Sequence, residues 1–191
     1  MNFSRDEKKI LLQAARDSIT SLFVDKEVEE PDCEKHPDLK IKAGAFVTLK
    51  EYEELRGCIG YVISDSPLFK TVCNAAKSAA VNDPRFYPLQ KEELINIKIE
   101  ISVLSPPFKM DSYDDIVLGA HGLILEDLGR KGLLLPQVPT EHNMNKEEYL
   151  EAICNKAGLP GNTWKTKQLN MKLFTATVFS EEEMREKNEL N

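Results

Sequence analysis

Residues 97–104 read Ile-Lys-Ile-Glu-Ile-Ser-Val-Leu, and this stretch has the clearest secondary-structure signal in the chain. Apolar and polar side chains alternate along it, which is the period of a β-strand with one buried face. Pro106 and Pro107 follow and end the strand, because proline lacks the N–H that a ladder needs. The stretch therefore predicts a strand with Glu100 on its polar face, where the carboxylate is either solvated or paired with an arginine.

The segment before this strand predicts a hairpin followed by a helix. Residues 45–49 and 58–63 are β-prone runs. The charged segment 50–57 between them ends in glycine, which indicates an antiparallel hairpin with a longer loop. A helix then opens at Ser66-Pro67, with serine as the cap and proline at the first helical position.

Two further helices are predicted from apolar side chains at helical spacing, over residues 5–23 and 146–157. Ser4 and Glu7 have the spacing of a capping box, in which each side chain satisfies a free backbone amide. Asn145 has the position of a cap for the later helix.

The C-terminal half adds more strands. Leucine- and isoleucine-rich runs at 123–125 and 133–135 flank the glycine-bounded segment 129–132, which indicates a hairpin, and residues 173–179 predict a last strand. Residues 181–191 form a highly charged tail. Strands outnumber helices without a regular strand–helix alternation, which favours an α+β fold with mostly antiparallel sheet and flanking helices.

Length and charge limit the class of protein. The 191 residues suit one domain, or two small lobes sharing a core. A formal net charge of -7 opposes binding to nucleic acid or to an anionic membrane surface. No apolar run approaches the roughly 18 residues of a membrane span. The N-terminus turns charged at once and lacks the apolar core of a signal peptide, so we expect a cytoplasmic protein.

Cysteine and histidine usage gives no indication of a metal or a cofactor. The four cysteines form no C-x-x-C pair, and free thiols are expected in a cytoplasmic protein. With three histidines, none of them paired closely with carboxylates, we expect no preformed metal site. Phosphate-loop and dinucleotide-binding motifs are absent from the sequence, and we expect no cofactor.

The segment 55–61, Leu-Arg-Gly-Cys-Ile-Gly-Tyr, contains the strongest candidate site. In an extended segment Arg56, Cys58 and Gly60 share one face, because side chains alternate. Gly57 and Gly60 flank the cysteine, and a strand glycine often marks close approach by a ligand or by another backbone. Arg56 would favour thiolate over thiol. The segment therefore fits a nucleophile or an anion-binding pocket, but the residues alone favour the alternative, a buried cysteine with glycines for tight packing.

Other residues could contribute to such a site. Asp83 and Arg85 place a carboxylate and a second arginine on a rigid loop, or form a surface ion pair. His121 lies between glycines and is a candidate general base for Cys58. Gln137 lies in a proline-rich loop and either binds a polar ligand group or is solvated.

Several of these segments together resemble the AMMECR family, over nearly the whole chain from about residue 45 to 179. The motifs occur in the family's order: LRGCIGY at 55–61, DPRFYPL at 83–89, IEISVLSPP at 99–107, HGL at 121–123, LLLPQV at 133–138, CNKAGL at 154–159, and Trp164.

The resemblance implies a two-lobed α+β fold with the signature motif lining a cleft between the lobes. The larger lobe would contain about 1–110 and 166–180, and the smaller, β-rich lobe about 111–165. It implies no assigned biochemical activity. In many microbes relatives are fused to, or encoded beside, a Memo-like protein and a radical SAM protein, which suggests a shared modification pathway.

Two functions from different classes follow. In the first, the chain is a cysteine-dependent enzyme acting on a small anionic ligand or a protein substrate. Cys58 is then the nucleophile, Arg56 and Arg85 hold an anion and lower the thiol pKa, and His121 and Glu100 transfer protons. In the second, the chain is a non-catalytic module that binds a Memo-like or radical SAM partner, and the thiol of Cys58 is incidental. A third function, nucleic-acid binding, would need a hidden basic face.

Overall fold

A computed structural model describes residues 1–184 of the chain, which divide into two compact units. The first unit contains Met1–Leu104 together with the segment that begins at Thr177, and the second contains Ser105–Ala176. The segments 105–110 and 166–176 thus belong to the second unit, although the predicted lobes place them in the first. These segments belong to the second unit because their strands pair within the second sheet.

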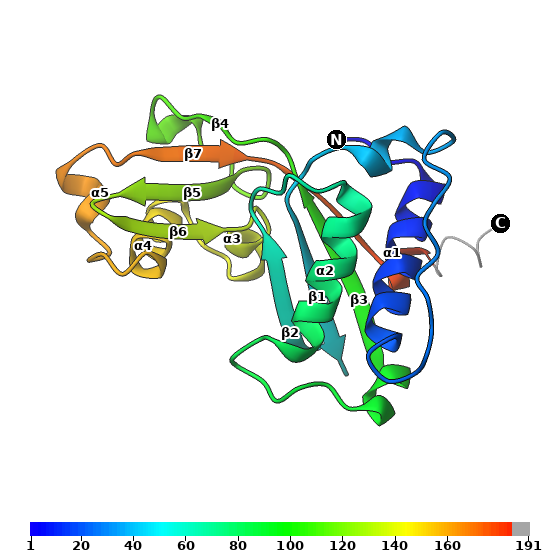
Figure 1. Cartoon of the computed structure of the whole chain (residues 1–191). Helices are drawn as coiled ribbons and strands as arrows, with labels where there is room; N and C mark the ends of the chain where they lie inside the picture. Colours follow the sequence, from blue (N-terminus) through cyan, green and yellow to red (C-terminus); the bar gives the residue numbers. More distant parts are fainter. Residues whose placement is uncertain (185–191) are drawn as a thin grey trace. The chain divides into compact units, whose positions relative to one another are not determined.

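The first unit is built on a four-stranded sheet with the order β2-β1-β3-β8 (Figure 1). Its strands are β1 (Ala45–Glu51), β2 (Glu54–Tyr61), β3 (Ile97–Leu104) and β8 (Ala176–Ser180). Both β2 and β3 run antiparallel to the central strand β1. The strand predicted over 97–104 is therefore confirmed, and it lies inside the sheet.

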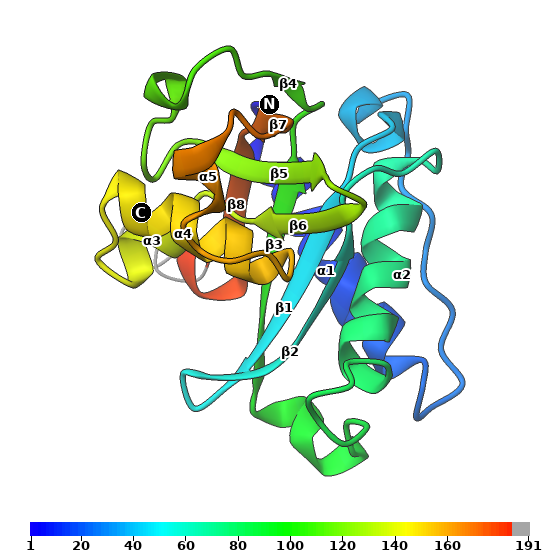
Figure 2. The same ribbon diagram turned by 90° about the vertical axis from the view of Figure 1, so that its left-hand side faces the viewer.

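Two helices, α1 (Arg5–Thr20) and α2 (Leu68–Val81), cover the same face of this sheet (Figure 2). The alternate residues Val47, Ile99 and Ile101 turn toward the helices and are at most 1% exposed. Burying apolar side chains there contributes about 1.5–3 kcal/mol each. Short 3-10 turns at Pro37–Lys40 and Lys91–Ile95 complete the unit.

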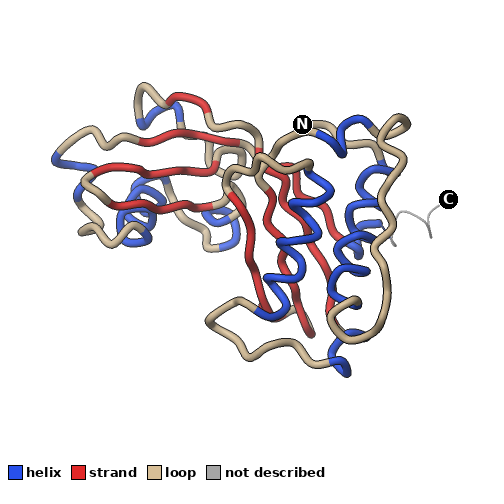
Figure 3. Tube along the Cα trace, viewed as in Figure 1, coloured by secondary structure: helices blue, strands red, loops and turns tan. Residues whose placement is uncertain are grey.

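The second unit has its own sheet, in the order β4-β7-β5-β6, and its own core (Figure 3). The strands are β4 (Phe108–Lys109), β5 (Gly122–Asp127), β6 (Arg130–Leu134) and β7 (Met171–Phe174), and the helices are η3 (Tyr113–Asp115), α3 (Val138–Glu141), α4 (Lys146–Lys156) and α5 (Thr163–Thr166). The apolar side of α4 packs against β5 and β6. Asn145 caps α4 and forms a capping box with Glu148, as its position predicts.

The α+β class with antiparallel pairing is confirmed, but the first hairpin is tighter than predicted. Its loop is only Tyr52-Glu53, with φ of 50° and 67°. A two-residue loop with positive φ at both positions matches the twist of the flanking strands. The charged residues of 50–57 other than Glu53 lie in the strands themselves, so the polar pattern that indicated a longer loop reflects an exposed hairpin end.

Two other predictions need correction. The cap of α2 is Pro67, which provides no side-chain hydrogen bond, and Ser66 lies before the cap. The single strand predicted over 173–179 is two strands, β7 and β8, in different sheets. The chain leaves the ladder at Thr175, which exchanges hydrogen bonds with Ser105. Because apolar side chains continue through the break, the sequence pattern does not reveal it.

The charged tail is anchored where it begins: the Glu181 carboxylate accepts a hydrogen bond from the backbone N–H of Ile99. Its last seven residues, 185–191, lie outside the described part of the chain. None of the helices in residues 1–184 combines the length and the apolar character needed to cross a bilayer.

Candidate functional site

The face of the first sheet that is turned away from α1 and α2 carries a row of polar side chains across three strands. Strand register places Cys58 of β2 opposite Thr48 of β1, and Thr48 opposite Glu100 of β3. Directly opposite residues share a face. We call Cys58, Thr48 and Glu100 the polar row. The structure thus brings together Cys58 and Glu100, two of the predicted catalytic residues, on one face of the sheet.

Thr48, in the middle of the polar row, and Lys50, which pairs with Glu100, were both missed by the sequence reasoning. The Thr48 hydroxyl donates a hydrogen bond to Cys58 Sγ over 3.3 Å. Lys50 Nζ lies 3.2 Å from Glu100 Oε2 and neutralises that carboxylate. Pairing the predicted strands in register would have identified Thr48. Lys50 was missed because the predicted strand ended at residue 49, whereas β1 continues to Glu51.

Asp83 closes the outer edge of β2 beside the thiol. Its Oδ2 accepts the backbone N–H of Cys58 over 2.8 Å. Arg85 donates to both carboxylate oxygens, at 3.0 and 2.7 Å. The hydrogen bonds from Arg85, together with the two backbone N–H groups that Asp83 accepts, hold the pKa of Asp83 well below its usual range, although burial opposes the shift. Of these two predicted site residues, Asp83 is therefore a buried carboxylate that binds the edge of β2, and Arg85 is its ion-pair partner.

Arg56 forms an ion pair with a different carboxylate, that of Glu93. Its Nε and Nη2 donate to Glu93 over 2.6 and 3.1 Å, which raises the pKa of Arg56 and lowers that of Glu93. The guanidinium groups of Arg56 and Arg85 lie 6.0 and 5.4 Å from the centre of the Phe86 ring. The Arg56–Glu93 ion pair, the hydrogen bond from the Cys58 N–H to Asp83 and the contact of Arg56 with the Phe86 ring thus fasten the loop 82–96 to the edge of β2.

The predicted lowering of the Cys58 pKa is wrong. Burial raises the pKa of the thiol, and the hydrogen bond from Thr48 and the charge of Arg85 only oppose that shift. Arg56 does not contribute, because its charge is already balanced by Glu93. A thiol whose pKa is raised above the ordinary value is largely protonated at neutral pH, so it is a poor nucleophile.

Neither glycine of the motif leaves an open notch beside the thiol. A Cβ added at Gly57 would lie 2.3 Å from the carbonyl oxygen of Ala79 on α2. A Cβ added at Gly60 would lie 2.4 Å from Phe46 Cγ and 2.4 Å from the carbonyl oxygen of Ala45. Both glycines therefore allow tight internal packing. Of the alternatives that the sequence left open at these glycines, the structure therefore supports tight packing and not close approach by a ligand.

The other two predicted site residues, His121 and Gln137, belong to the second unit. His121 Nδ1 lies 3.1 Å from the carbonyl oxygen of Asp115, and its ring meets Phe108 edge-on at 5.5 Å. Gln137 precedes α3, and its Oε1 is buried without a hydrogen-bond partner in the described structure. A role for either residue in the chemistry of Cys58 stays a prediction.

Within residues 1–184, no three His, Cys, Asp or Glu side chains are grouped to hold a metal ion. Two surface pockets of about 440 Å³ each lie elsewhere, one against α1 and one in the second unit. No predicted site residue lines either pocket.

Comparisons with known proteins agree with the fold and with the motif order. The AMMECR1 family model matches residues 12–179. A protein of Methanopyrus kandleri is 42% identical over 190 residues, covering 93% of this chain and 90% of its own. One from Aquifex aeolicus is 40% identical over 180 residues, covering 91% and 92%.

Among solved structures, the crystal structure of the uncharacterized protein PH0010 from Pyrococcus horikoshii is similar to this chain. It superposes with a TM-score of 0.86 at 39% identity, covering 94% of each chain. The match of both sequence and structure spans the two units described above. This chain belongs to the AMMECR1 family.

Proposed function

We propose that the chain is a non-catalytic binding module that recognises a partner protein at the edge of its first sheet. The recognition surface consists of β2 around Cys58 and the loop 82–96 fastened to it. The observation that carries the proposal is that the positive charges around Cys58 are already balanced by carboxylates of the same chain. Arg56, Arg85 and Lys50 each already form an ion pair, with Glu93, Asp83 and Glu100 respectively.

A site in this state is better suited to recognition than to nucleophilic catalysis. A catalytic cysteine needs an uncompensated positive charge or a base that favours its thiolate. Here each arginine is already paired with a carboxylate through two of its nitrogens, and burial raises the pKa of Cys58. The same internal pairs hold the loop 82–96 in place, and a preorganised surface loses less entropy on binding.

The loop presents side chains typical of binding hot spots. The Arg85 side chain is 54% exposed beyond its pairing with Asp83. Tyr87, two residues further on, is 91% exposed, and Ile95 is 89% exposed. Tyrosine and arginine are enriched among residues that dominate binding energy. The family resemblance suggests a Memo-like or a radical SAM protein as the partner, within a shared modification pathway in the cytoplasm.

The binding of the purified full chain to the Memo-like and radical SAM proteins of the same organism tests the proposal. We expect Cys58→Ser to bind a partner as tightly as the wild type, because the thiol is incidental. We expect Tyr87→Ala to weaken binding by at least about 2 kcal/mol, or roughly thirtyfold. Tyr52→Ala removes another exposed tyrosine, 75% exposed, from the hairpin turn and is the matched control.

The opposite pattern would overturn the proposal. Loss of binding in Cys58→Ser with tight binding in Tyr87→Ala would place recognition at the thiol. Equal weakening by Tyr87→Ala and Tyr52→Ala would indicate non-specific adhesion.

A cysteine-dependent enzyme is the second candidate, and one contact favours it. The hydrogen bond from Thr48 to Cys58 Sγ lowers the thiol pKa in part, and Glu100 faces Thr48 across the sheet as a proton acceptor. A small anionic ligand or a protein substrate would then meet Arg85 beside the thiol. In this case Cys58→Ser abolishes modification of the partner while partner binding persists. The cleft between lobes that the resemblance implies stays a prediction.

A further inference from the structure

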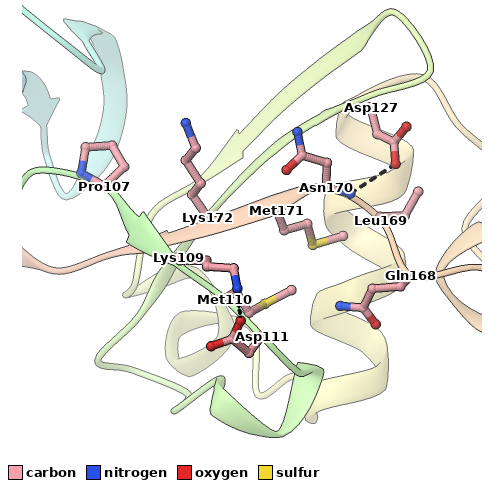
Figure 4. Close-up of a pocket in the computed structure, with 10 residues that line it drawn as sticks. All are labelled: Pro107, Lys109, Met110, Asp111, Asp127, Gln168, Leu169, Asn170, Met171 and Lys172. Carbon is pink, nitrogen blue, oxygen red and sulfur yellow. Dashed lines mark hydrogen bonds and ion pairs between the residues drawn. The ribbon is translucent and has the colours of Figure 1, made fainter.

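The second unit contains a hollow where two neighbouring strands separate. The ladder between β4 and β7 has only two residue pairs and ends at Lys109 and Lys172. Beyond this pair, residues 110–111 and 168–171 diverge and line a hollow of about 440 Å³ (Figure 4). That volume lies within the range of small-molecule sites, about 300–1,000 Å³.

The floor of the hollow is apolar and adaptable. Met110, Leu169 and Met171 line it and are 6%, 2% and 3% exposed. In Figure 4 the two methionine side chains lie between the diverging segments, with the charged side chains at the rim. Methionine is unbranched and polarisable, so a floor of this kind accommodates apolar groups of varied shape.

The rim has an unusual charge arrangement. Lys109 and Lys172 form the last pair of the ladder, and unbalanced like charges in this position destabilise a sheet. Lys109 is balanced by an ion pair with Asp111. Asp127 is balanced by Lys167 and accepts the backbone N–H of Asn170. Among the rim's charged side chains, and within residues 1–184, Lys172 is thus the one without an ion pair.

We propose that this hollow binds a small amphiphilic anion, with its negative group on Lys172 and its apolar body against Met110 and Met171. An anion there would give Lys172 the counter-charge that Asp111 already gives to Lys109. Its apolar part would lie against the methionine side chains that line the hollow. The inference concerns the second unit alone and does not depend on the proposed function of the Cys58 site.

Methyl NMR of the full chain, labelled with [methyl-¹³C]methionine, tests the inference with octanoate as the probe. Octan-1-ol and octylammonium, which have the same chain length, are the neutral and cationic comparisons. We expect octanoate to shift the methyl resonances of Met110 and Met171 saturably, with a dissociation constant at least about tenfold below those of the other two probes. The Met144 methyl, elsewhere in the same unit, should stay in place.

Two lysine variants separate a specific anchor from general charge. Lys172→Gln should weaken octanoate binding about tenfold. Lys131→Gln removes an 81% exposed lysine of the same sheet and should leave binding unchanged. The inference is wrong if no probe gives a saturable shift, if octan-1-ol binds as well as octanoate, or if the two variants weaken binding equally.

Discussion

At the residue scale, Asp83 is the group on which the edge of the first sheet depends. Its side chain is only 2% exposed, and it accepts hydrogen bonds from Arg85 and from the backbone N–H of Cys58. Replacing this carboxylate by an amide removes the charge that pairs with Arg85 and leaves one acceptor oxygen, beside an NH2 donor, for the guanidinium and the backbone N–H. The penalty of an unsatisfied buried group is about 1–3 kcal/mol, and more for a charged one.

We therefore predict that Asp83→Asn lowers the free energy of unfolding by about 2–4 kcal/mol. It should also change the dependence of stability on pH. The pKa of Asp83 is lower in the folded than in the unfolded chain. Its contribution to the free energy of unfolding is therefore fully present above the unfolded pKa of about 3.9 and is lost as the pH falls from that value toward the folded pKa. Urea unfolding between pH 3 and 7 measures both effects. A wild type and variant with parallel pH profiles would contradict this account.

The glycines of the motif give a second prediction at this scale. Gly60→Ala forces a methyl group against Phe46 and the backbone of Ala45, and we expect a loss of about 1–3 kcal/mol. The control is Gly161→Ala, whose added Cβ would meet only side-chain atoms at 3.3–3.6 Å. That control should change the unfolding free energy by less than about 1 kcal/mol. If Gly60→Ala is as stable as the control, the space beside Cys58 is open, and close approach by a ligand at this glycine becomes the better interpretation.

At the element scale, the end of β8 is fastened to α1 and β3 by one ion pair. Arg16 of α1 donates to Glu181 and to the carbonyl oxygens of Leu94 and Ile97. Glu181, the residue after the end of β8, also accepts the backbone N–H of Ile99 with its side chain. This hydrogen bond continues the pairing of β3 where β8 ends. The side chains of Arg16 and Glu181 are 21% and 17% exposed, so water screens the pair less than a surface pair.

We predict that Glu181→Ala lowers the free energy of unfolding by about 2–3 kcal/mol, because Arg16 and the Ile99 amide lose their acceptor. Glu182→Ala is the matched control, since Glu182 pairs with Lys98 on an exposed surface. An exposed pair contributes about 0–1 kcal/mol. Urea denaturation of the full chain measures both. Equal effects would mean that the Glu181 contacts add no more than a surface ion pair.

The first hairpin gives a prediction about its turn. Tyr52 and Glu53 both adopt positive φ without glycine or asparagine. Replacing them by Asn-Gly, the pair that favours this turn, should raise the free energy of unfolding by about 0.5–2 kcal/mol. Loss of the Glu53–Lys98 surface pair subtracts little. A destabilised variant would show that the side chains of the turn, rather than its backbone, stabilise the hairpin.

At the scale of the whole molecule, local patterns predicted the elements, and long-range pairing decided the site. The alternation of Ile97 to Val103 identified β3, and the cap at Asn145 identified the start of α4. The residues that contact Cys58 are a different matter. Asp83 reaches it from a loop 25 positions away, and the choice of Glu93 over Cys58 as the partner of Arg56 depends on how that loop folds. Sequence spacing contains no such information.

Burial is the second quantity that the sequence did not provide. The two glycines beside Cys58 suggested an accessible thiol, but Gly57 allows α2 to pack closely on one face of β2 and Gly60 allows Phe46 to pack closely on the face of the thiol. The direction of the pKa shift follows from that packing: desolvation outweighs the charge of Arg85. The whole account of the site, as a charge-balanced binding surface with a protonated thiol, depends on this balance.

The rate of alkylation of Cys58 as a function of pH, followed by mass spectrometry on the folded protein, tests that balance most directly. Cys33, in the loop between α1 and β1, provides the internal comparison. The account predicts that Cys58 reacts more slowly than Cys33, with a midpoint above the value of about 8.5 for a free thiol. Fast labelling of Cys58 with a midpoint well below that value would contradict the account and favour a catalytic thiolate.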